Sequence, residues 1–575
     1  MKQLLRRLLI GLTALIVLIS LGAVILTKVI DPNQYRSSLQ SLALENGVKL
    51  VIAGDLDWQL LPLGIQANQV NFALQDQSMA GEFEQLTVGI SFSNLIAFDF
   101  EQRLPVSSFS VSNGRLLYAL PDSLPVQFSN IQLSSHQIDT QGELFPVSVS
   151  LQAPKGLKLL FESEIGLSIA NQSLASLVLS DFTLGLNKVR ISGDIEATNN
   201  LSAIRGKLST EAFDLLDQFK LIKKFVPDLY IPQPAGAKAL KEIAVDSQFA
   251  IDVKNISQVQ TTLIIDGQKF DIDMLVDQPN YKLTTLIYGD SFDLTAYMPP
   301  ASSSESNSML FAPLAIPLAV WHGQSQMELH LNQLKLEKMT VSKIYANLFG
   351  NQNVFKLTSF NADIFAGQVD ATATLDLQSS VANFKAQTTI TNLDLGAMFD
   401  VEEDSSGMAG ILDLNANIQS SGNEIETIIQ SLTGSGNLSL VKPIFKGINL
   451  EQRFCEAARL FSSSTPSKKQ WPLGTQLDDL AAGFSIDDGK LMIKDYQTAV
   501  GNVALSGNST IDFAKGKYKF NATGLLKQSK TSKTGCAVSK MLQKRKIPFV
   551  CKGKFGNKAN CRPDNKLLSS LIKKN

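Results

Sequence analysis

Apolar residues alternate with polar residues along most of the chain after residue 47. The clearest alternating apolar positions are Leu86, Val88, Ile90, Leu184, Leu186, Leu375 and Leu377. Because successive side chains of a strand point to opposite faces of its sheet, a period of two predicts strands with one apolar and one solvated face. Such strands are typical of antiparallel sheets. A parallel α/β fold would show a sustained alternation of strands and helices, and the sequence does not contain one. The chain is therefore predicted to be mainly β.

Turns and a few helices are expected to interrupt these strands. Four dipeptides predict turns, namely Asn113-Gly114, Asn199-Asn200, Asp266-Gly267 and Asp488-Gly489. A helix is predicted at residues 33–44, because Asp31-Pro32 suits a cap and first turn. Helices are also predicted at residues 211–225, 423–432 and 449–461, where apolar residues recur at helical spacing. Residues 301–308, 402–407 and 462–469 are mostly small and polar and show no periodicity, which predicts loops.

The N-terminal region predicts a single membrane anchor. Lys2, Arg6 and Arg7 precede a run without charge at residues 8–27, which as a helix reaches about 30 Å, the thickness of a bilayer core. Positive charge stays in the cytoplasm, so the rest of the chain is expected outside it. The alternative is a cleaved signal peptide, although the apolar run exceeds the usual length and Ser20-Leu21-Gly22 is a weak cleavage site.

Charge is unevenly distributed along the chain. The net charge is −1, which argues against a nucleic-acid-binding protein. Residues 527–574 nevertheless contain fourteen Lys and Arg and one acid, Asp564. This basic stretch is either a solvated surface or a contact with anionic headgroups or lipopolysaccharide.

The four cysteines all lie near the C-terminus, at Cys455, Cys536, Cys551 and Cys561. An even, clustered set in an oxidising compartment predicts disulfides, and three connectivities are open. A zinc site is the alternative, but the spacing contains no Cys-x-x-Cys pair.

Motifs for catalysis or cofactor binding are absent from the sequence. The chain has three His and no Gly-x-Ser-x-Gly, Walker-type loop, His-Glu-x-x-His or dinucleotide fingerprint. No catalytic, metal or cofactor-binding residues are therefore predicted. A glycosidase with two carboxylates distant in sequence stays open as an alternative, but a binding or carrier protein is the simpler expectation.

Short motifs from one end of the chain to the other resemble the AsmA family of Gram-negative envelope proteins. The N-terminal motifs are DPNQYR at residues 31–36, GVKL at 47–50, GDLDW at 54–58 and PLG at 62–64. IFAG at 364–367, LDLG at 393–396 and LTGSG at 432–436 are similar in the middle, where pattern matches better than identity. GINLEQRFC at 447–455 and the segments around Cys536, Cys551 and Cys561 resemble the family's C-terminal region.

This resemblance implies a transmembrane helix followed by an elongated antiparallel β-groove, as in bridge-like lipid-transfer proteins. An apolar sheet face must be covered by another sheet or by a ligand such as acyl chains. The implied function is outer-membrane biogenesis from the inner membrane and periplasm, with phospholipid or lipopolysaccharide bound along the groove. The alternating apolar positions given above are the candidate lipid-facing residues. The alternative is a scaffold that assists the machinery inserting outer-membrane proteins.

Three regions follow from these expectations. Residues 1–30 form the cytoplasmic N-terminus and anchor, and residues 31–440 form the groove with its short helices. Residues 441–575 form a C-terminal region with a helix, strands, the four cysteines and the basic tail. A groove of this length needs about 25–35 strands.

Overall fold

A computed structural model provides the structure of the protein. It describes residues 31–45, 47–60, 63–76, 78–90, 106–119, 126–139, 141–170, 173–224, 231, 234, 236–298, 323–336, 339–400, 408–446, 449–459, 470–472, 474–501, 503–526, 546–554 and 560–564. The predicted anchor, the three predicted loops and Cys536 lie outside these residues. Within them, no helix has the length and apolar character needed to cross a bilayer.

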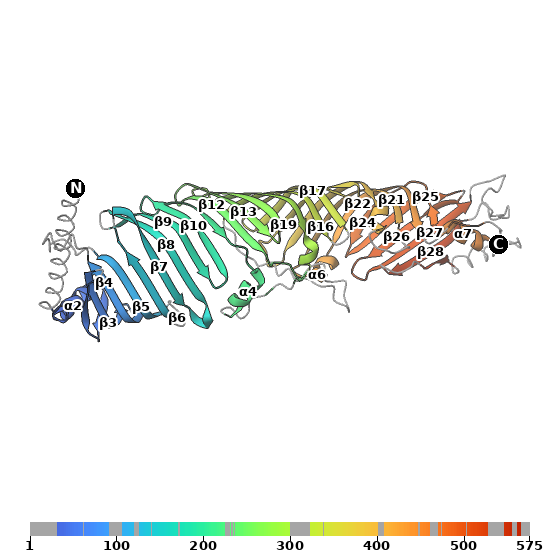
Figure 1. The fold of residues 1–575 in the computed structure, drawn as a ribbon. Coiled ribbons are helices and arrows are strands. Elements are labelled where there is room, and N and C mark those ends of the chain that lie inside the picture. Colours follow the sequence, from blue (N-terminus) through green and yellow to red (C-terminus); the bar gives the residue numbers. More distant parts are fainter. Residues whose placement is uncertain are drawn as a thin grey trace, which may run out of the picture. The chain divides into compact units, whose positions relative to one another are not determined.

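The chain divides into two compact units. Unit one comprises Met1–Pro232 and Leu240–Asp266, and unit two comprises Gln233–Ala239 and Gly267–Asn575. Both are mainly β, and together their described residues form 29 strands, within the expected range. Figure 1 shows the strands of unit one in blue to green and those of unit two in green to red.

Unit one contains thirteen strands in chain order. These are β1 (Val48–Ile52), β2 (Leu56–Leu60), β3 (Leu63–Leu74), β4 (Met79–Ile90), β5 (Val106–Tyr118), β6 (Val126–His136), β7 (Gln141–Gln152), β8 (Lys158–Ala170), β9 (Ser173–Leu186), β10 (Val189–Thr198), β11 (Ala203–Thr210), β12 (Ile243–Asp252) and β13 (Ile256–Ile265). Each strand from β3 onward pairs antiparallel with the next in sequence, and β1 and β2 both pair with β3.

Unit two contains the remaining strands. These are β14 (Gln268–Asp277), β15 (Lys282–Asp293), β16 (Gln324–Leu336), β17 (Met339–Asn351), β18 (Val354–Ile364), β19 (Gly367–Asp376), β20 (Asn383–Asp394), β21 (Met408–Ser421), β22 (Thr433–Lys446), β23 (Gly474–Gln476), β24 (Leu480–Asp487), β25 (Lys490–Val500), β26 (Val503–Asp512), β27 (Lys517–Leu526), β28 (Lys546–Lys554) and β29 (Asn560–Pro563). Sequential pairing prevails here too, with β22 joined to both β23 and β24.

One pairing departs from the antiparallel expectation. Strands β15 and β16 run parallel, with Ile287 opposite Leu329. Consecutive parallel strands need a crossover of a dozen or more residues. Residues 294–323, which separate the two strands, meet that requirement.

The helices are short and mostly lie where the sequence predicts them. They are η1 (Pro32–Tyr35), α2 (Arg36–Glu45), η2 (Pro154–Gly156), α4 (Leu215–Lys223), η3 (Leu294–Tyr297), α5 (Leu395–Asp400), α6 (Ile425–Gln430) and α7 (Leu450–Arg459). The helix predicted from residue 211 begins four residues later, because Asp214 caps it by accepting a hydrogen bond from the backbone N–H of Asp217. Phe213 is extended and bridges to Ile243. Helix α5 has no counterpart among the predicted helices.

Three of the four predicted turns are confirmed, and one prediction is wrong. Asn113 and Gly114 lie inside β5, not between strands. Asn113 has a φ of 50°, and the register with β6 shifts between Val111 and Gly114, so the pair forms a β-bulge. Left-handed backbone at Asn113 suits a bulge as well as a hairpin turn, which is why Asn-Gly alone does not distinguish them.

Candidate functional site

A continuous row of apolar side chains crosses unit one from β2 to β10. Its members are direct register partners in successive antiparallel pairs, so they share one face of the sheet. This unit-one apolar row consists of Leu56, Ala67, Leu86, Val111, Leu133, Val149, Phe161, Leu184 and Ile191. The row is continuous because the register of each strand places an apolar residue opposite an apolar residue of each neighbouring strand.

The residue next to each member of this row belongs to an equally continuous polar row on the opposite face. This unit-one polar row consists of Asp57, Gln66, Thr87, Ser110, Ser134, Ser148, Glu162, Thr183, Ser192 and Ser209. The two rows establish that the sheet of unit one is apolar on one face and polar on the other.

Unit two repeats the arrangement from β14 to β28. Its apolar row consists of Ile272, Ile287, Leu329, Ala346, Phe360, Ala371, Thr388, Ala416, Gly436, Phe484, Ile493, Ser509, Phe520 and Cys551. No member carries a charge. The polar interruptions, Thr388 and Ser509, are small hydroxyl side chains. The unit-two apolar row is thus uncharged throughout, although it is less uniform than that of unit one.

Much of each apolar row is only partly covered. In unit one, Leu86, Leu133, Phe161 and Leu184 are half-buried. Ile272, Ile287, Leu329, Phe360 and Ile493 are half-buried in unit two. In a β-sandwich the inward residues of both sheets interdigitate and are buried. Within the part of the chain that the structure describes, these faces therefore present apolar surface without a second sheet packed upon it.

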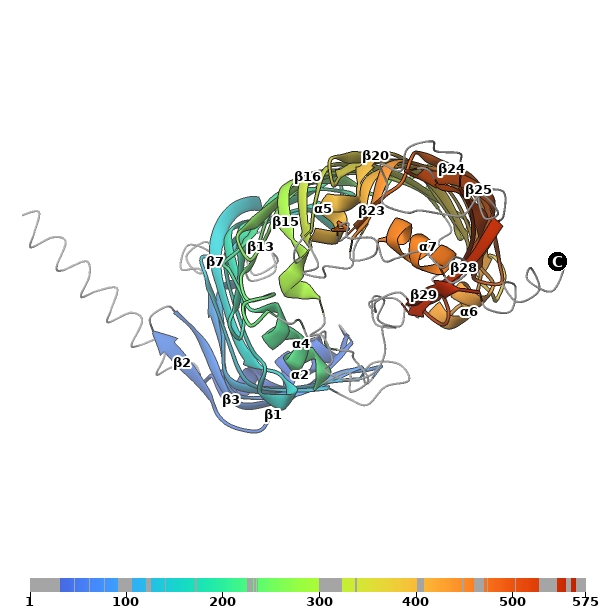
Figure 2. The same cartoon turned by 90° about the vertical axis from the view of Figure 1, so that its right-hand side faces the viewer.

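Short helices cover parts of the apolar faces. In unit one, Leu39 of α2 packs on the buried cluster of Ile52, Leu56, Ala67 and Val70, so the first members of the row lie beneath α2. In unit two, α5 contributes Leu395 to a cluster with Leu393 and Leu440. Figure 2 shows α2 inside the curve of the blue strands and α5 and α7 inside the curve of the yellow to red strands.

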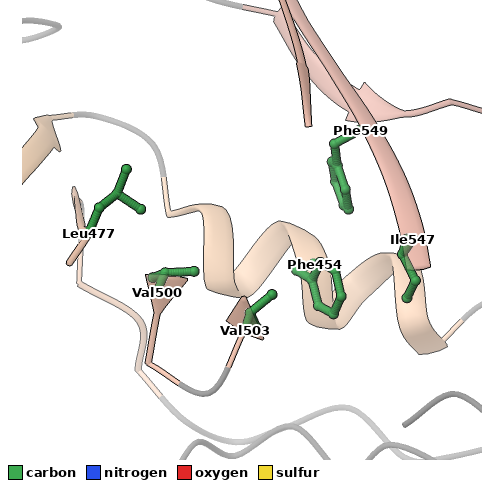
Figure 3. Close-up of a cluster of buried hydrophobic side chains, with 6 residues drawn as sticks. All are labelled: Phe454, Leu477, Val500, Val503, Ile547 and Phe549. Atoms are coloured by element: carbon green, nitrogen blue, oxygen red, sulfur yellow. The ribbon is translucent and has the colours of Figure 1, made fainter. Parts of the chain in front are cut away.

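Helix α7 covers the apolar face of β26–β28. Phe454 lies against Val503, Ile547 and Phe549 (Figure 3), and its ring stacks on Phe549 at 5.8 Å. Gly524 makes this contact close, because a Cβ added there would stand 2.1 Å from Phe454 Cε2. The apolar face is therefore occupied by the chain's own helix at this point.

Six of the seven candidate lipid-facing residues can be placed, and they fall into three groups. Leu86 and Leu184 belong to the unit-one apolar row. Val88, Leu186 and Leu375 lie on the same faces, Val88 between Ile65 and Phe109, Leu186 between Leu159 and Val189, and Leu375 between Phe355 and Phe384. Leu377 follows the end of β19 and is 7% exposed, so it contributes no open surface. The side chain of Ile90 lies outside the described residues.

Two N-terminal sequence motifs meet at the edge of unit one. Asn33 exchanges two hydrogen bonds with the backbone of Leu56, and the Arg36 guanidinium donates to the Gly54 carbonyl at 2.7 Å. A Cβ on Gly54 would stand 2.6 Å from the Asn68 carbonyl oxygen, so only glycine fits there. These contacts hold the segment containing α2 against β2 and against Gly54, which precedes it.

Ionisable groups are sparse on the apolar faces. His330 stacks on Tyr288 at 4.8 Å, meets Tyr345 edge-on, and lies 2.7 Å from Glu328, all on the polar face of unit two. Tyr496 is largely buried, which raises its pKa to about 12. Among the described residues, His, Cys, Asp and Glu form no group of three able to hold a metal ion.

The described cysteines lie close to the end of unit two. Strand β28 places Cys551 directly opposite Cys561 of β29. Cys455 lies in α7. The sequence left three connectivities open, and this register singles out one pair of neighbours.

Comparisons with known proteins agree with the sequence motifs. The model of the AsmA family matches residues 1–119 and 123–496. The protein AsmA of Escherichia coli (strain K12) is 19% identical over 547 residues, which cover 88% of this chain and 86% of that protein. No solved structure matches significantly.

Proposed function

This chain belongs to the AsmA family, and we propose that it binds the acyl chains of phospholipid or lipopolysaccharide along the apolar faces of its two units. The protein acts in biogenesis of the outer membrane. The observation that carries the proposal is the pair of apolar rows, which are continuous across strands and of which many members are only half-buried. A hydrocarbon ligand would complete their burial.

The energetics favour such a ligand. Transfer of each CH₂ group from water to an apolar surface contributes about 0.8 kcal/mol. At about 4.8 Å per strand, the part of the unit-one apolar row beyond α2, from Leu86 to Ile191, extends about 29 Å, about twice the roughly 15 Å depth of one leaflet of hydrocarbon. An acyl chain can therefore lie along the row while its headgroup stays in water at the ends of the strands.

Photo-crosslinking tests the proposal at matched positions. A benzophenone amino acid replaces Leu184 or Leu133 on the apolar face, or the adjacent Thr183 or Ser134 on the polar face. Irradiation in cells followed by mass spectrometry should detect lipid adducts at Leu184 and Leu133 only. Equal adducts on both faces, or none on either, would refute acyl-chain binding.

The same experiment addresses the alternative function. A protein that assists insertion of outer-membrane proteins would crosslink to polypeptide. Polypeptide adducts at Leu184 without lipid adducts would favour the assembly role.

The proposal includes retention in the inner membrane through residues 8–27. Their uncharged run and the preceding Lys2, Arg6 and Arg7 support an anchor with the units on the periplasmic side. Mass spectrometry of the purified protein should find the residues before Gly22 intact. An N-terminus immediately after Gly22 would indicate a cleaved signal peptide instead.

A further inference from the structure

Two pairs of lysines face each other directly across β27 and β28. Lys517 is opposite Lys554, and Lys519 is opposite Lys552. All four side chains are exposed. Like charges directly opposite in an antiparallel pair destabilise it, so this arrangement opposes the stability of the two strands that carry it.

Two carboxylate residues lie near these lysines, Asp512 at the end of β26 and Asp564, whose backbone N–H donates to the Pro548 carbonyl of β28. Arg562 of β29 lies on the same face, opposite Val550, and completes what we call the terminal lysine patch (Lys517, Lys519, Lys552, Lys554 and Arg562). Asp512 is opposite Lys517, but it also approaches Lys515 at 3.7 Å. Within the described part of the chain, none of the five patch cations forms an ion pair with a carboxylate.

The core does not require these lysines. The opposite face of the same strands carries Phe520, Ala522 and Phe549, and it is there that α7 packs. Neutral residues with good strand propensity would serve the polar face equally well. The cations therefore call for an explanation outside the fold itself.

We propose that the terminal lysine patch docks on the surface of an anionic lipid membrane. The cations are spread over neighbouring strands about 4.8 Å apart, which suits an array of headgroups better than a single phosphate. The C-terminal sequence has the same excess of basic residues, with fourteen Lys and Arg and one acid in residues 527–574.

Membrane is favoured over nucleic acid by the rest of the chain. Outside residues 527–574 the net charge is about −14. The electrostatic attraction to an anionic surface is therefore confined to this end of the sequence. The last eleven residues also combine three lysines with Leu567, Leu568, Leu571 and Ile572, a composition suited to a lipid interface. This inference is independent of acyl-chain binding, because the patch lies on a polar face.

A vesicle-capture assay with the full chain tests the inference. The protein is reconstituted in nanodiscs of zwitterionic phosphatidylcholine, and fluorescent vesicles of phosphatidylcholine with or without phosphatidylglycerol are added. The patch variant carries Lys517→Gln, Lys519→Gln, Lys552→Gln and Lys554→Gln. The control variant carries Lys282→Gln, Lys335→Gln, Lys356→Gln and Lys385→Gln, which are exposed lysines of the same unit and change the net charge equally.

Capture of anionic vesicles should fall by more than about tenfold in the patch variant and stay unchanged in the control variant. High salt should abolish capture by the parent protein. The patch variant should resist denaturant at least as well as the parent, since its repulsion is removed, and this excludes misfolding as the cause. Equal loss in both variants, equal capture of zwitterionic vesicles, or patch-dependent binding of duplex DNA or inorganic phosphate without vesicle capture would overturn the inference.

Discussion

Asn33 and the backbone of Leu56 form a reciprocal pair of hydrogen bonds. The side-chain amide of Asn33 donates to the Leu56 carbonyl at 3.1 Å, and the Leu56 N–H donates to Asn33 Oδ1 at 3.0 Å. Leu56 is 1% exposed and begins the unit-one apolar row. The pair thus links the segment before α2 to the first strands of the sheet.

Replacement of Asn33 should weaken this end of unit one. Asn33→Ala removes both hydrogen bonds and leaves the Leu56 backbone groups without their partner, at a cost of roughly 1–3 kcal/mol. Hydrogen exchange of β1–β3 measures the local loss. Gln34→Ala, at an exposed neighbour, is the control. Equal protection in the two variants would mean that the pair contributes little.

A charge on the apolar face should interfere with ligand binding, and the same charge on the polar face should not. Leu184→Asp places a carboxylate within the unit-one apolar row, whereas Thr183→Asp places it in the unit-one polar row. Loss of one Leu contact and desolvation of the carboxylate predict at least about tenfold weaker lipid binding for Leu184→Asp. Co-purifying lipid per protein, quantified by mass spectrometry, is the measurement. Similar lipid content in both variants would contradict the assignment of the faces.

The contact between Gly524 and Phe454 should be sensitive to a single methyl group. Gly524→Ala places a Cβ 2.1 Å from the ring, so α7 must shift at a cost of about 1–3 kcal/mol. Limited proteolysis within α7 should accelerate. Phe454→Leu should lower the free energy of unfolding less in the Gly524→Ala background than in the parent protein, because the smaller side chain relieves the clash. Gly483→Ala serves as the control, because its nearest neighbour would lie 3.5 Å away.

Cys551 and Cys561 are expected to form a disulfide. Directly opposite residues in an antiparallel pair have Cα atoms about 4.5–5.5 Å apart, which is within the range that a disulfide bridges. Peptide mapping without reduction should identify this link in protein purified from the periplasmic side. A link from Cys551 to Cys455 or Cys536 would show that the register does not determine the connectivity.

Helix α4 should lose its N-terminal attachment in acid. Burial acts to raise the pKa of Asp214, but the hydrogen bond from Lys241 and the backbone N–H groups outweigh it, so the pKa lies below 3.8. A depressed carboxyl pKa stabilises the folded state above the unfolded value, and this contribution is lost as the pH falls through the folded pKa. Exchange of α4 amides, corrected for intrinsic rates, should therefore rise below pH 3.8. Asp214→Asn should show no such step there.

The local chemistry of the sequence was enough to predict several elements. Period-two alternation around Leu184 predicted an antiparallel strand with one apolar face, because neighbouring side chains point to opposite faces whatever the strand pairs with. Asp31-Pro32 predicted the start of a helical segment, since Asp31 accepts the Asn33 N–H and proline suits the first turn. Helix α4 was predicted too long, because the capping role of Asp214 was not recognised.

Alternation by itself determined which residues of each strand share a face. Only the tertiary structure decided the register between strands. Register depends on pairing between distant residues, and a shift of one residue moves every side chain to the other face. The alignment of Leu56 with Ile191 through the intervening strands, the opposition of Lys519 and Lys552, and the pairing of Cys551 with Cys561 are all decisions of register. The burial of Leu377 past the end of its strand and the parallel pair β15–β16 likewise came from packing, which no local pattern records.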